Sequence, residues 1–169
     1  MDTNVAGQQL TDTATAGPIA RPIRLFPAAL LLGFGLDHLL PLPFPVPGIG
    51  LVHWVSAIIA GFLILVGIGL FAAGVRDFSR AATPLPTNRP ARALVTTGVY
   101  GWTRNPIYLG FFLIHAGIGV AVRSPWILIL IMPIAVAMRH GVVAREEAYL
   151  ERRFGDVYRD YRRRVRRWL

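Results

Sequence analysis

The chain has 169 residues, of which 54% are hydrophobic and 16% are charged. A water-soluble domain of this size carries more charge, and the apolar residues of this chain form long blocks. The composition therefore indicates an integral membrane protein with one compact domain. The absence of cysteine excludes disulfides, thiolate metal sites and a cysteine nucleophile.

All 18 basic residues are arginine, and the formal net charge is +9. Nucleic-acid-binding proteins show similar bulk charge. In this chain, however, the arginines lie beside apolar spans and near the C-terminus, and no nucleic-acid fold signature is present. We therefore expect the arginines to face anionic membrane lipids, and we expect no nucleic-acid partner.

Residues 1–20 are polar and predict a disordered tail without the basic start and apolar core of a secretory signal peptide. Residues 21–169 are expected to form one membrane-embedded domain. Four apolar spans are predicted, at about Leu25–Leu40, Leu51–Val75, Pro106–Val122 and Trp126–Val143. The first span is short and is alternatively a re-entrant or interfacial segment. Glycines in the second span predict close helix packing.

The C-terminal tail has the pattern of an amphipathic helix, bent at Gly155. Apolar residues recur at three- and four-residue steps opposite an Arg-rich face, at Leu150, Phe154, Val157 or Tyr158, Tyr161, Val165 and Trp168. The fold class is therefore all-α, an integral membrane helical bundle of about four transmembrane helices plus this tail helix. The middle loop and the tail carry most of the arginines, which predicts that both termini lie in the cytoplasm.

A polar loop at residues 97–105 leads into the third span at Pro106, and Glu146-Glu147 follow the fourth span. A crossing of about 17 residues rises roughly 25 Å, so the third and fourth spans form a hairpin that returns the chain to its starting surface. The spacing therefore predicts that Arg104 lies at the same surface as the two glutamates. Ionisable groups at such a position indicate a functional site.

These segments offer a guanidinium, close-approach glycines, aromatic walls and carboxylates, at Arg104, Gly98, Gly101, Tyr100, Trp102, Tyr108, Glu146 and Glu147. S-adenosylmethionine would satisfy this set, because it carries a carboxylate, an ammonium, a ribose, an aromatic base and a sulfonium. The alternatives are an ordinary juxtamembrane Arg104 and solvated glutamates paired with nearby arginines. No group of His, Asp and Glu has metal-ligand spacing, so no metal is expected.

The segments Leu94–Tyr100 and Arg104–Gly110, with Glu146-Glu147 and the tail pattern, resemble the isoprenylcysteine carboxyl methyltransferase and phospholipid methyltransferase superfamily. The resemblance spans about residues 76–168. It implies a membrane enzyme that binds S-adenosylmethionine in a cytoplasmic pocket and takes a lipid substrate from the bilayer. By this resemblance, residues 94–110 and 139–168 form the cofactor region, with contacts from Gly98, Tyr100, Arg104, Asn105, Pro106, Tyr108, Leu109, Glu146 and Glu147.

The resemblance also assigns catalytic roles to Glu147 and Arg153, because Arg153 matches an arginine linked to the acceptor site. Asn105 stands where many members have histidine, so no titrating imidazole is expected there. The leading expectation is methyl transfer to a lipid or prenylcysteine-like carboxylate. The alternatives are phospholipid amine N-methylation and a non-catalytic membrane scaffold of the same fold. The acceptor's identity and the oligomeric state stay open.

Overall fold

The computed structural model describes residues 22–45, 50–83 and 91–169. Within these ranges the secondary structure is helical, apart from one isolated bridge between Thr103 and Arg166. The all-α prediction is therefore confirmed for the described part of the chain. The predicted disordered tail, residues 1–20, lies outside the described residues.

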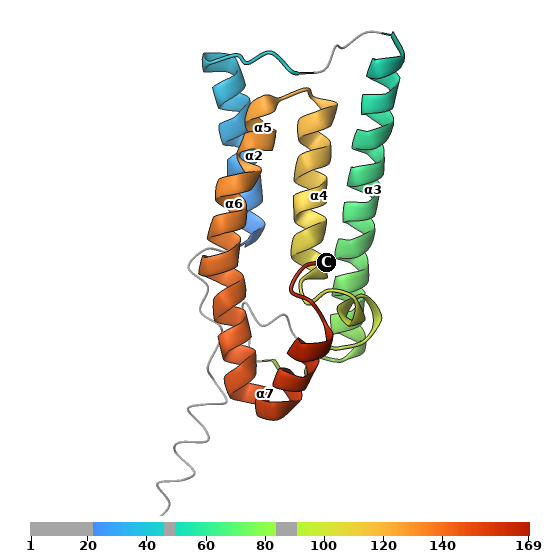
Figure 1. Cartoon of the computed structure of the whole chain (residues 1–169), viewed down its shortest axis with the longest axis vertical. Helices are drawn as coiled ribbons and strands as arrows, with labels where there is room; N and C mark the ends of the chain where they lie inside the picture. The colour runs from blue at the N-terminus through green and yellow to red at the C-terminus, as the bar shows by residue number, and fades with distance from the viewer. Residues whose placement is uncertain (1–21, 46–49, 84–90) are drawn as a thin grey trace, which may run out of the picture.

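The bundle consists of long helices. At one end a short turn at residues 122–124 joins two of them, and at the other end the last helix turns back toward the bundle. Figure 1 shows α3 beside α4, α2 beside α5 and α6, and α7 turning back so that the chain ends at the base of α4. The elements are α2 (Pro22–Leu39), α3 (Gly50–Arg80), the 3-10 helix η1 (Gly98–Gly101), α4 (Pro106–Ala121), α5 (Pro125–Ile129), α6 (Ile131–Ala137), the π-helix η2 (Met138–Val143) and α7 (Ala144–Arg164).

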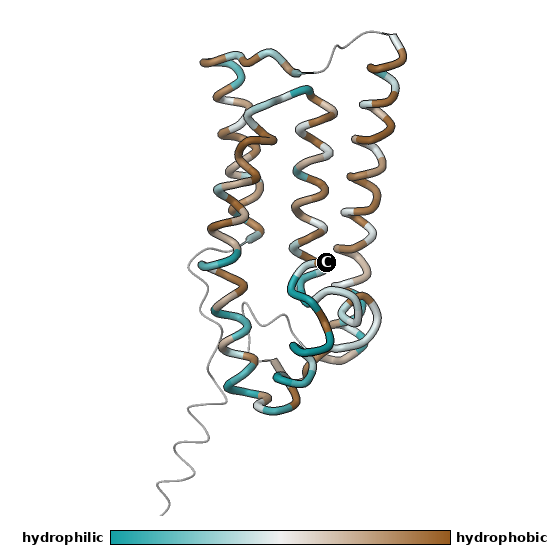
Figure 2. Tube along the Cα trace, in the orientation of Figure 1, coloured by the Kyte–Doolittle hydropathy of each residue, from teal (hydrophilic) through white to brown (hydrophobic). Residues whose placement is uncertain are grey.

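Two helical stretches in the described part of the chain are long and apolar enough to cross a membrane. They are α3 and the continuous stretch Pro125–Arg164, which runs from α5 into α7. Helix α4 is apolar but shorter, with 16 residues. Large apolar side chains such as Trp54 and Phe62 are exposed on the outer face of α3, as expected for a lipid-facing helix. Figure 2 shows apolar residues along the long helices and polar residues concentrated around α7.

The turn between α4 and α5 has a local chemical cause. Pro125 occupies the first turn of α5, where its missing N–H costs nothing. The Ser124 hydroxyl caps this helix by accepting a hydrogen bond from the Ile127 backbone N–H at 3.0 Å. The tight turn returns the chain antiparallel to α4, so that η2 and α7 come back to the end at which α4 begins (Figure 1).

Glycines bring α3 and α4 into close contact. A Cβ atom on Gly110 would lie 2.6 Å from the Gly67 carbonyl oxygen, which is closer than packed atoms approach. The predicted packing role is therefore confirmed for Gly67. Gly61 and Gly69 have no atom within 4 Å of an added Cβ, so they do not serve this contact.

Helix α7 is kinked at Gly155, which has φ +52° and ψ −125°. This confirms the predicted bend. After the kink, Tyr158 and Tyr161 face inward and are buried, whereas Val157 faces outward and is 64% exposed. The amphipathic pattern therefore runs through Tyr158 rather than Val157.

Candidate functional site at the polar end of the bundle

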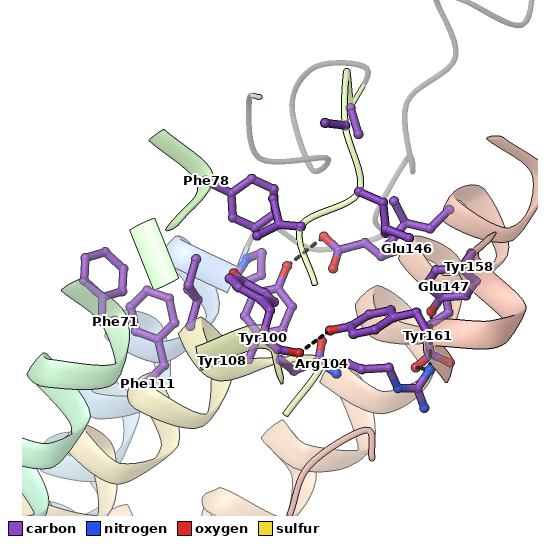
Figure 3. A pocket seen from close by; sticks show the side chains of 18 of the residues that line it. Phe71, Phe78, Tyr100, Arg104, Tyr108, Phe111, Glu146, Glu147, Tyr158 and Tyr161 are labelled. Atoms are coloured by element: carbon purple, nitrogen blue, oxygen red, sulfur yellow. Dashed lines mark hydrogen bonds and ion pairs between the residues drawn. The ribbon is translucent and has the colours of Figure 1, made fainter. Parts of the chain in front are cut away.

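A cavity of about 350 Å³ lies where α2, α3, α4 and α7 converge. Its volume is within the range of small-molecule sites, which starts at roughly 300 Å³. Figure 3 shows the aromatic side chains of Phe71 and Phe111 on one side and the carboxylates of Glu146 and Glu147 on the other. The cavity therefore has an apolar wall facing a charged one. Besides these four, the residues that line it are Pro22, Ile23, Arg24, Phe78, Ala91, Ala93, Leu94, Val95, Tyr100, Arg104, Asn105, Ile107, Tyr108, Leu150, Tyr158 and Tyr161.

The loop before α4 is held in place by Asp77 of α3. Its buried carboxylate accepts a hydrogen bond from the Val99 backbone N–H at 3.0 Å. Gly98 has φ +62°, a conformation that favours glycine, and a Cβ atom on Gly98 would overlap the Asp77 carboxylate. This glycine is thus required by the backbone and by its neighbour, while Tyr100 at the end of the same turn lines the cavity.

Arg104 and Glu147 form a buried ion pair, with Arg104 Nη1 at 2.9 Å from Glu147 Oε1. Both side chains are only 10% exposed. Arg104 Nη1 also donates to the Tyr158 hydroxyl at 3.3 Å. The expected proximity of the loop to the glutamate pair is therefore confirmed, and the two ends of the helical hairpin meet at one site.

Glu147 has a second guanidinium partner, Arg167. Arg167 Nε donates to Glu147 Oε1 at 3.0 Å, and Arg167 Nη2 donates to Glu147 Oε2 at 2.5 Å. These hydrogen bonds raise the pKa of Arg167 above its usual value. Both carboxylate oxygens are therefore engaged by arginine. A carboxylate in such a bidentate arrangement is firmly oriented.

The other glutamate, Glu146, accepts a hydrogen bond from the Tyr108 hydroxyl at 2.7 Å. The Tyr161 hydroxyl donates to the Tyr100 backbone carbonyl at 2.7 Å, as Figure 3 shows. Burial raises the pKa of Tyr100, and the nearby Tyr161 and Glu146 add to this effect. The phenol of Tyr100 therefore stays neutral at physiological pH and can act as a hydrogen-bond donor.

The last residues of the chain bind back onto the loop before α4. The Arg104 backbone N–H donates to the Arg166 carbonyl at 3.0 Å. The Arg167 carbonyl accepts from Asn105 Nδ2 at 2.9 Å and from the Thr103 hydroxyl at 3.3 Å. We call Val165–Leu169 the C-terminal strap. It ties the Arg104 loop to the end of α7.

The structure brings together six of the residues expected at the site, because Tyr100, Arg104, Asn105, Tyr108, Glu146 and Glu147 all line the cavity. It places Gly98, Pro106, Leu109 and Arg153 outside the lining. Gly98 shapes the loop, and Pro106 begins α4.

Arg153 donates from Nε to the Ala91 carbonyl at 2.5 Å. The Tyr149 hydroxyl accepts from the Ala91 N–H at 3.0 Å, so α7 grips both backbone groups of one buried residue. Ala91 lines the cavity together with Ala93, Leu94 and Val95 of the same segment. Arg153 therefore holds a cavity wall in place.

Sequence reasoning placed Tyr158 and Arg167 within the expected cofactor region without naming them as contacts, and it did not name Asp77 at all. Arg167 is one of many arginines in the tail, and nothing in the local pattern separates it from its solvated neighbours. Asp77 carried a signal that could have found it, since a carboxylate at the end of an apolar helix is costly to bury without a partner.

The donor set fits a ligand with a carboxylate. Arg104 Nε is buried and has no hydrogen-bond partner within the described residues, although Nη1 is engaged. A buried donor without a partner is costly, so this atom is suited to an acceptor supplied by a ligand. Tyrosine rings, apolar side chains and glutamates around the same cavity can hold a base, a methylene chain and hydroxyl or ammonium groups.

The described chain is a helical bundle with two stretches apolar enough to cross a membrane and with a cavity, the size of a small-molecule site, at its polar end. Comparison with known families gives the particular family: the model of the phospholipid methyltransferase family matches residues 55–157, more than half of the chain. The protein belongs to this family. The matched region includes the loop before α4, the glutamate pair and most of α7.

Individual relatives agree. Protein-S-isoprenylcysteine O-methyltransferase from Rattus norvegicus is 29% identical over 125 residues, which cover 70% of this chain and 42% of the rat protein. The protein of the same name from Schizosaccharomyces pombe is 35% identical over 72 residues, 43% of this chain and 30% of that protein. A Saccharomyces cerevisiae protein with this name matches to the same extent. The chain thus spans less than half of the length of these relatives.

Proposed function

We propose that this protein is an integral membrane methyltransferase that uses S-adenosylmethionine and methylates a lipid or prenylcysteine-like carboxylate. The observation that carries the proposal is the cavity in which Arg104 and Glu147 are paired and buried opposite an apolar wall. Membership of the phospholipid methyltransferase family supports methyl transfer. The names of the relatives support a prenylcysteine-like acceptor.

In this proposal the domain spans residues 21–169 and crosses the bilayer four times, through α2, α3, α4 and the α5–α6 stretch. The distribution of arginine supports cytoplasmic termini, because positively charged loops are retained in the cytoplasm. Helix α7 and the cavity then lie at the cytoplasmic surface, where a water-soluble methyl donor is available.

Arg104 is proposed to bind the carboxylate of the methyl donor through its free Nε, and Glu146 or Glu147 to accept hydrogen bonds from its hydroxyl or ammonium groups. Tyr100 and Tyr108 supply aromatic faces and neutral hydroxyls beside them. When bound, S-adenosylmethionine supplies an electrophilic methyl group on a sulfonium. The protein contributes positioning, exclusion of water and charge placement.

The state of Glu147 favours a carboxylate acceptor over an amine. An amine acceptor has to lose a proton, and a nearby base is needed to take it. Both oxygens of Glu147 are engaged by Arg104 and Arg167, so this carboxylate is poorly placed to act as that base. A carboxylate acceptor needs no base, and Glu147 then serves to hold the two arginines and the cofactor.

The first test is calorimetric titration of the detergent-purified protein with S-adenosylhomocysteine. The wild type should bind saturably, and Glu147→Gln should weaken binding by about tenfold or more because it removes the charge shared by two guanidiniums. Glu151→Gln is the matched control, since Glu151 lies on the same helix, pairs with Arg162 at the surface and does not line the cavity. Tyr108→Phe removes the hydroxyl that donates to Glu146 and keeps the aromatic ring, so it tests the same wall with less risk to folding.

Methyl transfer to a carboxylate lipid is then measured with the same four proteins. Loss of binding and transfer in Glu147→Gln, with both retained in Glu151→Gln, supports the enzyme. Equal binding and transfer in all four proteins would refute the assigned site. A well-folded wild type that does not bind the ligand in lipid nanodiscs would instead favour a membrane scaffold.

A further inference from the structure

Arg24 of α2 lines the same cavity as the buried ion pair between Arg104 and Glu147. It is in the first turn of α2, and its side chain is exposed. Its neighbour Ile23 also lines the cavity and is 68% exposed, and Phe71 of α3 lines it and is 37% exposed. Residues that are both exposed and part of the lining mark a mouth, which here opens between α2 and α3.

Some of the charged side chains around the cavity have a hydrogen-bond or ion-pair partner of their own, and one has no carboxylate partner among the described residues. Among the described residues, four charged side chains line it: Arg24, Arg104, Glu146 and Glu147. Arg104 is paired with Glu147, and Glu146 accepts from Tyr108. Arg24 has no carboxylate within ion-pair distance among the described residues. Within the described lining, Arg24 is therefore the cation that is available to a second ligand.

The charge balance favours an anion at this position. The two arginines and two glutamates of the lining sum to zero, and Arg167 adds one positive charge through its contact with Glu147. A methyl donor with a sulfonium, an ammonium and a carboxylate adds another. An anionic acceptor reduces this positive excess, whereas a cationic one increases it.

We propose that Arg24 binds the anionic group of the methyl acceptor and makes the site selective for anionic amphiphiles. The inference rests on the proposed function. The anionic group is the accepting carboxylate itself, or a phosphate next to the accepting atom. A cavity of about 350 Å³ is near the lower limit for a ligand site, so the long apolar chain of the acceptor lies outside it, past Ile23 and Phe71 in the lipid.

Ligands of similar structure but different charge test this assignment without requiring turnover. Equilibrium binding is measured in nanodiscs of neutral lipid for an S-prenyl-N-acetylcysteine, which is anionic, and for its methyl ester, which is neutral. A short-chain phosphatidic acid supplies the phosphate arm. The proteins are the wild type, Arg24→Gln, Arg24→Lys and Arg80→Gln. Arg80 is the matched control, since it is an exposed arginine at the end of α3 and does not line the cavity.

The wild type should bind one of the anionic ligands about tenfold more tightly than the neutral ester, as one favourable charge contact provides. Arg24→Gln should reduce this preference to about twofold or less, Arg24→Lys should keep most of it, and Arg80→Gln should not change it. The arm that responds identifies the anion as carboxylate or phosphate.

S-adenosylhomocysteine binding separates this inference from the proposed function. Unchanged affinity in Arg24→Gln, together with a lost charge preference, assigns Arg24 to the acceptor. A parallel loss of both would place Arg24 in the cofactor site and overturn the inference. The inference would also be overturned if the wild type bound the S-prenyl-N-acetylcysteine, the phosphatidic acid and the neutral methyl ester with equal affinity. Charge preference without any S-adenosylhomocysteine binding would leave the anion site standing and refute the methyltransferase proposal.

Discussion

Arg104 is the side chain on which the polar contacts of the cavity converge. Its Nη1 contacts Glu147 and Tyr158, its backbone N–H binds the C-terminal strap, and its Nε lacks a partner within the described residues. Burying a guanidinium is costly unless its donors are satisfied. These contacts therefore fix the direction of the guanidinium and leave Nε as a donor for the proposed ligand.

Gly98 sets the path of the loop that carries Arg104, and this gives a direct test. Gly98→Ala should destabilise the protein by about 1–2 kcal/mol, since the left-handed conformation disfavours a Cβ atom, and the overlap with Asp77 adds to the cost. It should also weaken S-adenosylhomocysteine binding. The measurements are thermal unfolding in detergent and calorimetric titration.

Gly101→Ala is the control for this change. Gly101 lies three residues further along the same turn, has an ordinary φ, and an added Cβ would be 3.7 Å from the nearest atom. It should behave like the wild type. A Gly98→Ala protein as stable as Gly101→Ala would show that the Asp77 contact does not fix the loop.

Arg153 and Tyr149 are expected to act together. Both bind the backbone of Ala91, which lines the cavity. Arg153→Gln and Tyr149→Phe should therefore weaken the binding of S-adenosylhomocysteine and of the acceptor to a similar extent. A buried N–H left without its acceptor costs about 1–3 kcal/mol, so Tyr149→Phe should also lower the unfolding temperature. The double variant should lose less binding free energy than the sum of the losses in the two single variants. If Arg153→Gln alone impaired acceptor binding, Arg153 would contact the acceptor itself.

The contact between α3 and α4 depends on the absence of side chains at Gly67 and Gly110. Gly110→Ala should destabilise the protein by about 1–3 kcal/mol, because overpacking forces two backbones apart. Gly69→Ala is the control. Gly69 is exposed on α3, and nothing lies within 4 Å of an added Cβ, so this change should be neutral or slightly stabilising. Thermal unfolding in detergent compares the two. Equal unfolding temperatures would show that the helices can separate without cost.

The positions of the long helices were predictable because hydropathy and proline mark them directly. The span expected from Pro106 ends at Ala121, and the second span begins one residue from its expected start, at Gly50. The second helix continues to Arg80, beyond its apolar part, because α3 reaches the loop it supports through Asp77. Such an extension depends on a tertiary contact and leaves no periodic signal.

The site was predictable where topology alone decides it and unpredictable where a backbone bend does. A helical hairpin brings Arg104 to Glu147 whatever the details of packing. The position of Arg167 depends on the kink at Gly155, which redirects the rest of α7, and on the end of α7 at Arg164, after which the backbone is extended at Val165. The same kink explains why the sequence left Val157 and Tyr158 as alternatives, and why the role of Arg167 could not be read from the tail.

The C-terminal end of the chain binds to the loop at the start of α4, and this contact has a consequence for ligand binding. The C-terminal strap supplies backbone acceptors to Arg104 and Asn105 and a guanidinium to Glu147. Removing residues 165–169 takes away both kinds of contact. The truncated protein should lose more than about tenfold in S-adenosylhomocysteine affinity, since two or more hydrogen bonds at about 1 kcal/mol each are lost with an ion pair.

Arg167→Gln separates the two contributions, because it keeps the backbone of the strap and removes only the charge. It should retain part of the affinity, so that calorimetric titration ranks the wild type first, Arg167→Gln second and the truncated chain last. Arg163→Gln, an exposed residue whose partner is Asp160 in the same helix, should match the wild type. If the truncated chain bound as tightly as Arg167→Gln, the strap would act through its charge alone, and the loop before α4 would be ordered by Asp77 without help from the end of the chain.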